Sequence, residues 1–236
     1  MIRFYAPDIK QCCELPESDS QHCVRVLRMR EGQEIEVVDG RGGLFRCRIA
    51  LANQHHTLLE IIEELELPKV WRPDLTVAIA PTKHNDRMEW LVEKLVEIGV
   101  DHIVPLRCER SERKDIKIDR LQKIAISAMK QSLKAILPDI QPTTPYMDFI
   151  GGCRDGARFI AYCDLSIPRL LFSRELPAAT DTTILIGPEG DFSPKEITAA
   201  LEAGFRPISL GDNRLRPETA ALVAADTFHI INQISQ

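Results

Sequence analysis

Two short glycine-containing segments hold the residues best suited to bind a ligand. They are residues 186–193, with the sequence IGPEGDFS, and residues 210–220, with the sequence LGDNRLRPETA. Glycine lets a backbone approach a flat ligand closely. A single Gly-Pro-Glu-Gly segment is more often a plain turn, so the presence of two such segments is what favours a site. Neither matches a phosphate-binding loop or a G-x-G-x-x-G fingerprint, which disfavours a phosphate-cradling nucleotide site.

Each segment lies between an expected strand and an expected helix. In this half of the chain apolar runs alternate with amphipathic segments, which is typical of a parallel α/β sheet. The expected strands are residues 75–80, 102–106, 157–163, 182–186 and 206–210. The expected helices are residues 85–98, 119–137, 194–203 and 218–234, with Gly99 closing the first and Ser193 capping the third. Since ligands bind beyond the carboxyl ends of parallel strands, both segments are expected to contribute to one site.

The first 68 residues follow a different pattern. Short alternating strands are expected at residues 32–40, 44–50 and 58–63, separated by Asp39-Gly40 and Gly42-Gly43 turns, after a helix at 19–29. Several short strands within about 60 residues favour a small barrel. Residues 65–74, with two prolines, are expected to form a linker. The sequence therefore predicts two domains, residues 1–68 and 74–236.

Composition limits the class of protein. With 236 residues, 44% hydrophobic and 28% charged, the chain is typical of globular proteins. It has no run of about 18 apolar residues and no signal-peptide core, so we expect a cytoplasmic protein without a membrane span. Seven cysteines without a C-x-x-C pair disfavour a metal site and fit reduced thiols. The net charge is −5, but residues 107–134 hold nine Lys/Arg against four Asp/Glu. That stretch is either a basic nucleic-acid face or a solvated helix surface.

The two glycine segments carry a resemblance to a known family. Ile186-Gly187-Pro188-Glu189-Gly190, then Leu210-Gly211 and Leu215-Arg216-x-Glu218-Thr219-Ala220, resemble the RsmE family. This family comprises the uridine-N3 methyltransferases of 16S ribosomal RNA, within the SPOUT superfamily. The resemblance extends over the whole chain, through Arg3-Phe4, residues 22–29 followed by Gly32, Lys83, residues 94–100 and residues 109–111.

The resemblance implies a fold, a cofactor and partners. It implies a PUA-like RNA-binding β-barrel domain at residues 1–68, followed by a SPOUT domain at 74–236 whose parallel sheet carries a trefoil knot. The knot would thread residues 185–220 and form the pocket for S-adenosyl-L-methionine. The implied substrate is 16S ribosomal RNA, within the assembled small ribosomal subunit. The implied assembly is a homodimer with the last helix in its interface, and the apolar residues 220–225 agree with a helix buried on two sides.

The resemblance, together with the chemistry of methyl transfer, selects the candidate site residues. When uracil N3 loses its proton, negative charge spreads to the flanking carbonyl oxygens, and a cation such as Arg216 would stabilise it. Glu218 would orient that cation or act as a base. The alternative for both residues is structural, with Arg216 paired to Glu218 and Glu218 interacting with a helix N-terminus. The cofactor candidates are Ile186, Gly187, Gly190, Leu210, Gly211 and Leu215. The RNA candidates are Arg25, Arg28, Arg46, Lys83, Arg110, Ser111, Arg113 and Lys134, all but Ser111 cationic and suited to phosphate.

Two positions and one segment depart from the family pattern. Asp191 stands where a second glycine is usual, and Asn213 stands where an arginine is usual. Residues 130–134 replace a pattern closer to Glu-Gln-Ser-Gly-Arg, so Lys134 keeps a cation but not the planar arginine fork.

The same sequence features allow three other functions. A related SPOUT enzyme could methylate a ribose 2′-hydroxyl or another base with a similar catalytic half. A non-catalytic RNA-binding module or ribosome assembly factor would keep the basic residues without the chemistry. An α/β enzyme that uses nucleotides is disfavoured by the missing phosphate loop.

Overall fold

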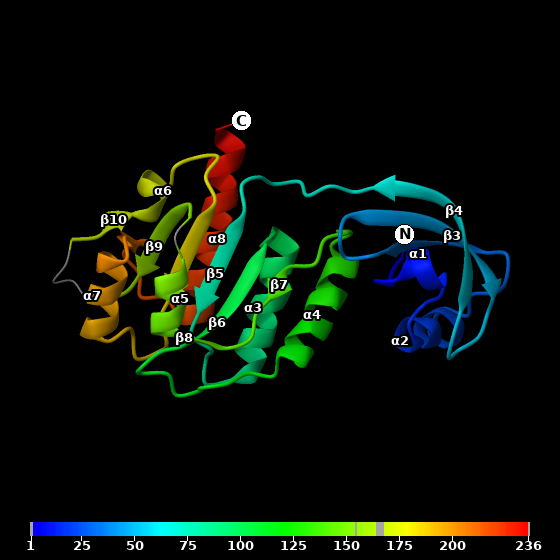
Figure 1. Cartoon of the computed structure of the whole chain (residues 1–236), viewed down its shortest axis with the longest axis horizontal. Helices are drawn as coiled ribbons and strands as arrows, with labels where there is room; N and C mark the ends of the chain where they lie inside the picture. Colours follow the sequence, from blue (N-terminus) through cyan, green and yellow to red (C-terminus); the bar gives the residue numbers. More distant parts are fainter. Residues whose placement is uncertain (1, 154, 164–167, 236) are drawn as a thin grey trace. The chain divides into compact units, whose positions relative to one another are not determined.

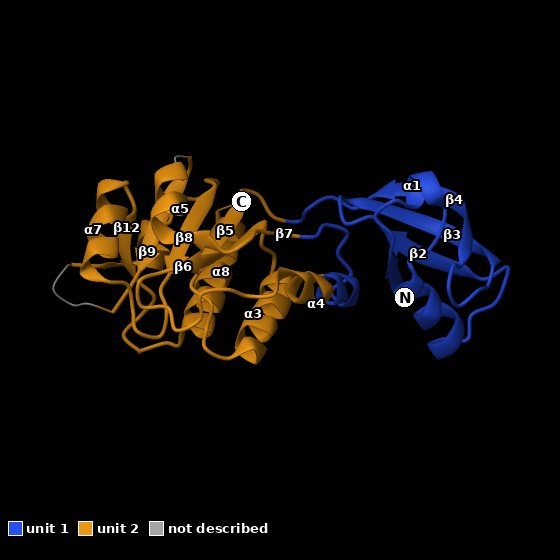
Figure 2. Ribbon diagram, turned by 60° about the horizontal axis from the view of Figure 1, so that its bottom comes forward, with its two compact units in different colours: residues 1–70, 126–137 blue, residues 71–125, 138–236 orange. Residues whose placement is uncertain are grey.

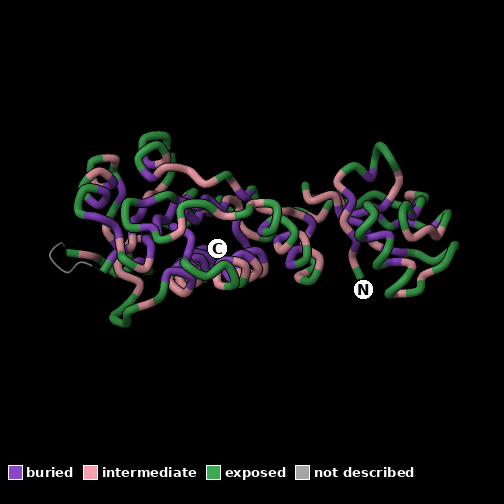
Figure 3. Tube along the Cα trace, turned by 90° about the horizontal axis from the view of Figure 1, so that it is seen from below, coloured by how far each residue is buried: buried purple, intermediate pink, exposed green. Residues whose placement is uncertain are grey.

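The computed structural model describes residues 2–153, 155–163 and 168–235. The chain forms two compact units (Figure 2). Unit 1 comprises Met1–Val70 and Ile126–Leu137, and unit 2 comprises Trp71–Ala125 and Pro138–Gln236. Buried segments run through the interior of each unit (Figure 3).

Unit 1 is built on a four-stranded sheet with the order β1-β2-β3-β4. Strand β1 (Arg3–Tyr5) runs parallel to β2 (Glu34–Val38), whereas β3 (Gly43–Leu51) and β4 (Leu58–Glu66) are antiparallel to their neighbours. In β3 the side chains of Phe45, Cys47 and Ile49 are buried and those of Arg46 and Arg48 are exposed, as the pleat requires. Strand β4 ends at Glu66, so the expected linker is shorter than the sequence suggested.

Short helices complete the core of unit 1. They are α1 (Ile9–Cys12), α2 (Glu17–Gln21) and the π-helix η1 (His22–Val26). Ile9 and Cys23 from these helices pack with Phe4, Val37 and Phe45 of the sheet. The prediction of one helix over residues 19–29 is wrong. The helical segment changes from α to π geometry at His22 and ends before Arg28, whose φ of 55° is left-handed.

A distant segment, residues 126–137, also belongs to unit 1. The N–H of Gly42 donates to the carbonyl of Ala135 at 2.9 Å, and the N–H of Leu137 donates to that of Gly40 at 2.9 Å. Lys130 pairs with the buried Asp19 at 2.7 Å. The expected helix 119–137 is too long. Helix α4 (Ile118–Gln131) ends before Leu133, whose φ of 55° is left-handed. Beyond it, Ile136 forms an isolated antiparallel β-bridge with Arg41.

Unit 2 contains an eight-stranded sheet, in which β10-β12-β9-β11-β5-β6-β7 are neighbours and β8 pairs with β6 (Figure 1). All of these pairs are parallel. The strands are β5 (Leu75–Ile79), β6 (His102–Arg107), β7 (Asp139–Ile140), β8 (Thr144–Pro145), β9 (Ala157–Ala161), β10 (Leu170–Leu171), β11 (Thr182–Ile186) and β12 (Arg206–Ser209). Every residue of β11 is buried, as expected for a strand covered on both faces.

Helices cover both faces of this sheet. Helices α5 (Tyr146–Gly152) and α7 (Pro194–Glu202) pack with one set of alternate strand residues, including Ala78, Ile160 and Leu185. The opposite set includes Phe159, whose ring meets Phe172 of α6 (Phe172–Glu175) edge to face. Helix α6 contacts α8 (Pro217–Ile234), which in turn packs on β5, β11 and α3 (Asn85–Ile98). No helix of the described residues is long and apolar enough to cross a membrane.

Candidate active site

A cavity of about 240 Å³ lies at the carboxyl ends of β9, β11 and β12. Ala161, Ile186 and Ser209, at or beside the ends of these strands, contribute to its wall. Both glycine segments meet here, as the sequence predicted. The wall includes all six candidate cofactor residues, Ile186, Gly187, Gly190, Leu210, Gly211 and Leu215.

The first loop, residues 187–193, is held in shape by its own turn and by the start of α7. The N–H of Asp191 donates to the carbonyl of Pro188 at 2.9 Å. A Cβ on Gly187 would come within 3.1 Å of the Phe192 ring, so a larger residue would displace that ring. Ser193 and Glu196 then form a reciprocal capping box at the first turn of α7, confirming the expected helix start.

The second loop, residues 210–216, depends on one glycine conformation. Gly211 has a φ of +120°, which residues with a side chain rarely adopt, although a Cβ would meet nothing within 4 Å. Ser209 Oγ accepts the Gly211 N–H at 3.2 Å and donates to the Gly211 carbonyl at 2.9 Å. The loop ends where Arg216 takes the N-cap position of α8, with Pro217 at the first helical position.

Charged side chains form part of the cavity wall. Glu189 accepts the Lys83 N–H at 2.9 Å through Oε1, whereas its buried Oε2 has no hydrogen-bond partner among the described residues. Asp191 accepts the N–H of Cys163 and that of Phe192, each at 2.9 Å. Arg169 and Arg214 also contribute to the wall. The cavity therefore offers carboxylates, guanidinium groups and apolar surface to a ligand.

The two candidate catalytic residues flank the cavity and are not part of its wall. Arg216 is exposed, and its side chain makes no hydrogen bond or ion pair with other described residues. Glu218 is 6% exposed; its Oε1 lies 3.7 Å from Nη1 of Arg87, and its Oε2 has no hydrogen-bond partner in the described chain. Pro217 and Ala220, on either side of Glu218, do contribute to the wall.

The unit 2 candidates for RNA contact connect the loop at residues 108–113 with the loops that contain Lys83 and Gly190. Arg113 donates twice to the carbonyl of Lys83, at 2.9 and 3.2 Å, and Lys83 Nζ lies 2.9 Å from Glu112. That hydrogen bond raises the pKa of the Lys83 ammonium. Arg110 donates to the carbonyl of Gly190 at 3.2 Å, while the hydroxyl of the buried Ser111 accepts the Cys108 N–H at 3.1 Å. These interactions fix the loop that faces Gly190.

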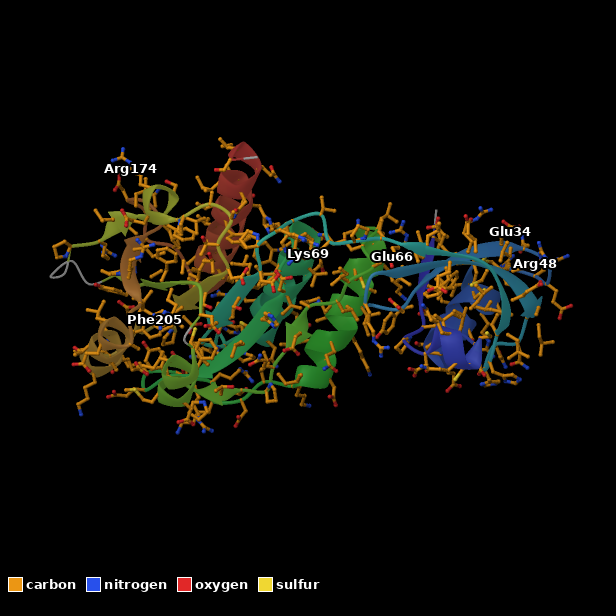
Figure 4. The ribbon with its side chains drawn as sticks, turned by 45° about the horizontal axis from the view of Figure 1, so that its top comes forward. Glu34, Arg48, Glu66, Lys69, Arg174 and Phe205 are labelled. Carbon is orange, nitrogen blue, oxygen red and sulfur yellow. The ribbon has the colours of Figure 1, made fainter. Side chains whose placement is uncertain are left out.

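The unit 1 candidates for RNA contact differ in whether their charge is already paired with a carboxylate. Arg25 and Arg28 are exposed and have no ion pair with the described residues. Arg46 lies 2.8 Å from Glu63 and 3.3 Å from Glu34, and these contacts raise its pKa. Arg48 pairs with Glu60 and Glu34 on the same exposed sheet face, where Figure 4 labels Arg48 and Glu34. Lys134 is half-buried in the 126–137 segment. The exposed face of this sheet therefore pairs its cations internally.

Buried groups behind the first loop remain uncharged. The Tyr146 hydroxyl donates to the carbonyl of Glu196 at 2.9 Å, and burial raises the pKa of that hydroxyl. Burial likewise raises the pKa of the Cys108 thiol. Both groups therefore support the loop as neutral side chains.

Comparison with known proteins identifies the family. Residues 70–229 match the family described as RNA methyltransferase domain, and residues 15–62 match that described as RNA methyltransferase PUA domain. The chain belongs to the RNA methyltransferase family. Ribosomal RNA small subunit methyltransferase E of Synechocystis sp. is 32% identical over 92% of this chain and 72% of its own length.

Solved structures of similar proteins agree with this family. A Porphyromonas gingivalis protein described as a "probable rRNA-methyltransferase" is 46% identical, with a TM-score of 0.95 over the full length of both chains. Ribosomal RNA small subunit methyltransferase E from Neisseria gonorrhoeae, bound to S-adenosyl methionine, is 28% identical, with a TM-score of 0.86 over 98% of both chains. These likenesses confirm the expected RNA methyltransferase fold.

Some residues of this RNA methyltransferase site were not found from the sequence. Arg87 comes from α3 and meets Glu218 only through the packing of α3 against α8. Cys163 and Arg169 contribute to the cavity wall from beyond the end of β9. Their only sequence signal was position: Cys163 is the last residue of the expected strand 157–163 and Arg169 follows it, where parallel sheets position ligand contacts. No group of three or more metal-binding side chains is found within the described ranges.

Proposed function

We propose that this chain methylates N3 of a specific uridine in 16S ribosomal RNA with S-adenosylmethionine, within the assembled small subunit in the cytoplasm. The observation that carries the proposal is one cavity whose wall includes all six residues that the sequence predicts for the cofactor. The names of the relatives support ribosomal RNA of the small subunit as the substrate class. The N-terminal match to a PUA domain supports an RNA-binding role for unit 1.

The cavity wall fits S-adenosylmethionine in its chemistry. The orphaned Glu189 Oε2 is a buried acceptor suited to an N–H or O–H donor of a ligand. Arg169 and Arg214 suit the carboxylate of an amino acid, and the carboxylates of Glu189 and Asp191 suit its cationic groups. Apolar surface for a flat base comes from Ile186, Ile208, Leu210 and Leu215. When bound, this cofactor supplies a methyl group activated by a sulfonium.

The protein's contribution to methyl transfer is positioning and charge stabilisation. Placing two reactants in line can lower such a barrier by about 7–11 kcal/mol. The target uracil N3 lies on the Watson–Crick edge, so the base must be unpaired or flipped out before it enters the site. Arg216, exposed beside the cavity and not held by another side chain of the described residues, is available to stabilise negative charge on the uracil carbonyl oxygens.

Glu218 is proposed to position the start of α8 and to act on the substrate proton. Its carboxylate is nearly buried, with Arg87 near one oxygen and no hydrogen bond to the other. A buried carboxylate with a free acceptor position can receive a proton or accept a hydrogen bond from an N–H donor. Arg87 would then be a positioning residue, because it approaches Glu218 and not the cavity.

RNA contacts are proposed for the exposed cations of both units. Arg25 and Arg28 lack acidic partners among the described residues, so their charge is available to phosphate, whereas Arg46 would first have to leave two glutamates. Arg110 and Arg113 belong to the loop that approaches Gly190, which supports an RNA contact close to the cavity. Lys83, Ser111 and Lys134 complete the proposed set, with Ser111 acting through the shape of its loop.

The trefoil knot and the homodimer are part of the same proposal. The resemblance to the SPOUT superfamily is what supports a threaded chain between residues 185 and 220, the stretch that contains both loops of the cavity. Helices α3 and α8 pack together, yet each exposes large apolar side chains: Trp90 at 42%, Ile230 at 45% and Ile234 at 77%. Such surface supports burial against a second copy. An unthreaded crystal structure would contradict the knot, and a monomer by light scattering at micromolar concentration would contradict the dimer.

The decisive experiment compares nucleosides from 16S ribosomal RNA of a parent strain and a strain that lacks the gene. Loss of 3-methyluridine, restored by the intact gene, is the expected result. An unchanged level of 3-methyluridine together with loss of a 2′-O-methylated nucleoside would show a different target atom. Calorimetry with S-adenosylmethionine tests the non-catalytic alternative, which predicts no binding even at millimolar concentration.

A further inference from the structure

Asp191 gives this chain a charge in the cavity wall where the family pattern has a glycine. Its φ of 60° is left-handed, which explains why glycine is usual at this position. Aspartate is one of the few other residues that visit this conformation routinely. The N–H of Asp191 closes the turn to Pro188, so the backbone conformation is part of the loop itself.

The Asp191 carboxylate is held against the cavity wall. Oδ2 accepts the N–H of Cys163, the next residue but one after β9, and Oδ1 accepts the N–H of Phe192. Both donors are neutral backbone groups, so they orient the carboxylate without cancelling its charge. Asp191 and Cys163 both contribute to the wall, so this negative charge is fixed at the cavity.

We infer that Asp191 is a specificity-determining residue that favours the methyl donor over its demethylated product; this rests on the proposed function. In the reaction the S–CH₃ bond breaks as the N3–CH₃ bond forms, sulfur keeps the electron pair, and the N3 proton leaves to a base or solvent. The sulfonium becomes a neutral thioether, so S-adenosylhomocysteine carries one positive charge fewer. A fixed negative charge therefore stabilises the bound donor more than the bound product.

The other charged side chains of the cavity wall do not add a preference for the donor over the product that is particular to this chain. Arg169 and Arg214 can pair with the amino-acid carboxylate, which donor and product share. Glu189 also carries a negative charge, but it belongs to the family motif, and the Lys83 ammonium lies within electrostatic reach of it. Asp191 is the negative charge that this chain has in addition to the family motif. Its consequence is that the product inhibits the enzyme less than it would with glycine at this position.

The test measures equilibrium binding of S-adenosylmethionine and S-adenosylhomocysteine to the full-length protein by calorimetry. Asp191→Asn removes the charge, tolerates the left-handed conformation and keeps one acceptor oxygen; Asp191→Gly restores the family residue. Both should reduce the preference for the donor by about fivefold, the effect expected for a partly exposed ion pair. Asp212→Asn is the matched control, because this exposed carboxylate on the second loop is not part of the wall.

The outcomes separate three explanations. Equal preference in the unmodified protein and both Asp191 variants would overturn the inference while leaving the proposed function intact. Equal weakening of both ligands in Asp191→Gly, but not in Asp191→Asn, would show that the hydrogen bonds matter and the charge does not. Failure of the unmodified protein to bind either ligand would overturn the proposed function itself. Sinefungin, which replaces the sulfonium by an aminated carbon and stays cationic, should follow the donor in every variant.

Discussion

Glu196 joins two loops of the site through one buried carboxylate, and its removal has a calculable effect. The side chain is 3% exposed; Oε2 accepts the N–H of Ser193 and Oε1 accepts the N–H of Glu109, each at 2.8 Å. Glu196→Ala removes both acceptors. The Ser193 N–H is then left in a buried position, whereas water can reach the exposed Glu109.

The expected loss in free energy of unfolding is about 2–4 kcal/mol. A hydrogen bond to a charged group contributes about 1.5–3 kcal/mol, so the Ser193 bond supplies most of the loss and the Glu109 bond less. Glu196→Gln keeps one acceptor oxygen, so it should cost about 1–2 kcal/mol. Cofactor affinity should fall in the same order, because Ser193 ends the loop that contributes Gly187 and Gly190 to the cavity.

Urea unfolding followed by tryptophan fluorescence measures this loss. Trp71 and Trp90 are the two tryptophans of the chain, and both lie in unit 2, so their signal reports on the unit that contains Glu196. Glu202→Ala is the control: the residue is exposed on the same helix, and its removal should change stability by less than about 0.5 kcal/mol. A loss for Glu196→Ala no larger than for this control would refute the reasoning.

Three further predictions concern catalysis, RNA binding and thiol access. Arg216→Ala should lower the single-turnover rate at saturating RNA by about 10²–10³, with melting temperature and cofactor affinity unchanged; a near-normal rate would remove it from the catalytic set. Arg28→Ala should make RNA binding less salt-dependent, by about one unit of the log–log slope, whereas Arg46→Ala should not, because its glutamates already pair with it. A thiol reagent at neutral pH should modify the exposed Cys163 and be blocked by cofactor, but should reach Cys47, whose pKa burial raises to about 11, only after unfolding.

The sequence predicted those parts of the fold that depend on local pattern. The apolar runs at β5 and β11 belong to strands buried on both faces, and Ser193 with Glu196 marks the start of α7. The two glycine segments share a cavity because parallel strands bring their carboxyl ends to the same edge. These inferences needed only periodicity, capping chemistry and the geometry of parallel sheets.

Other features depend on contacts that a single sequence does not reveal. The left-handed conformations of Arg28 and Leu133, which end the helical segments early, are unusual for those residue types. The pairing of Arg46 with Glu63 requires the register of β3 on β4, and that of Arg87 with Glu218 requires the packing of α3 on α8. The two-residue strands β7, β8 and β10 are too short to produce an alternating pattern.

The assignment of residues 126–137 to unit 1 has a consequence for how the chain matures during synthesis. Arg3 donates to the carbonyl of Leu133, and Gly40 and Gly42 bond to the segment 135–137, so unit 1 has all its parts only after residue 137 has been made. At about 5–20 residues per second, translation from residue 70 to residue 137 takes about 3–13 s. During that interval Lys130, which pairs with the buried Asp19 of α2, has not yet been made. A gene fusion that transplanted residues 1–70 alone would leave Asp19 without this ion pair, so we expect unit 1 to be transferable only together with residues 126–137.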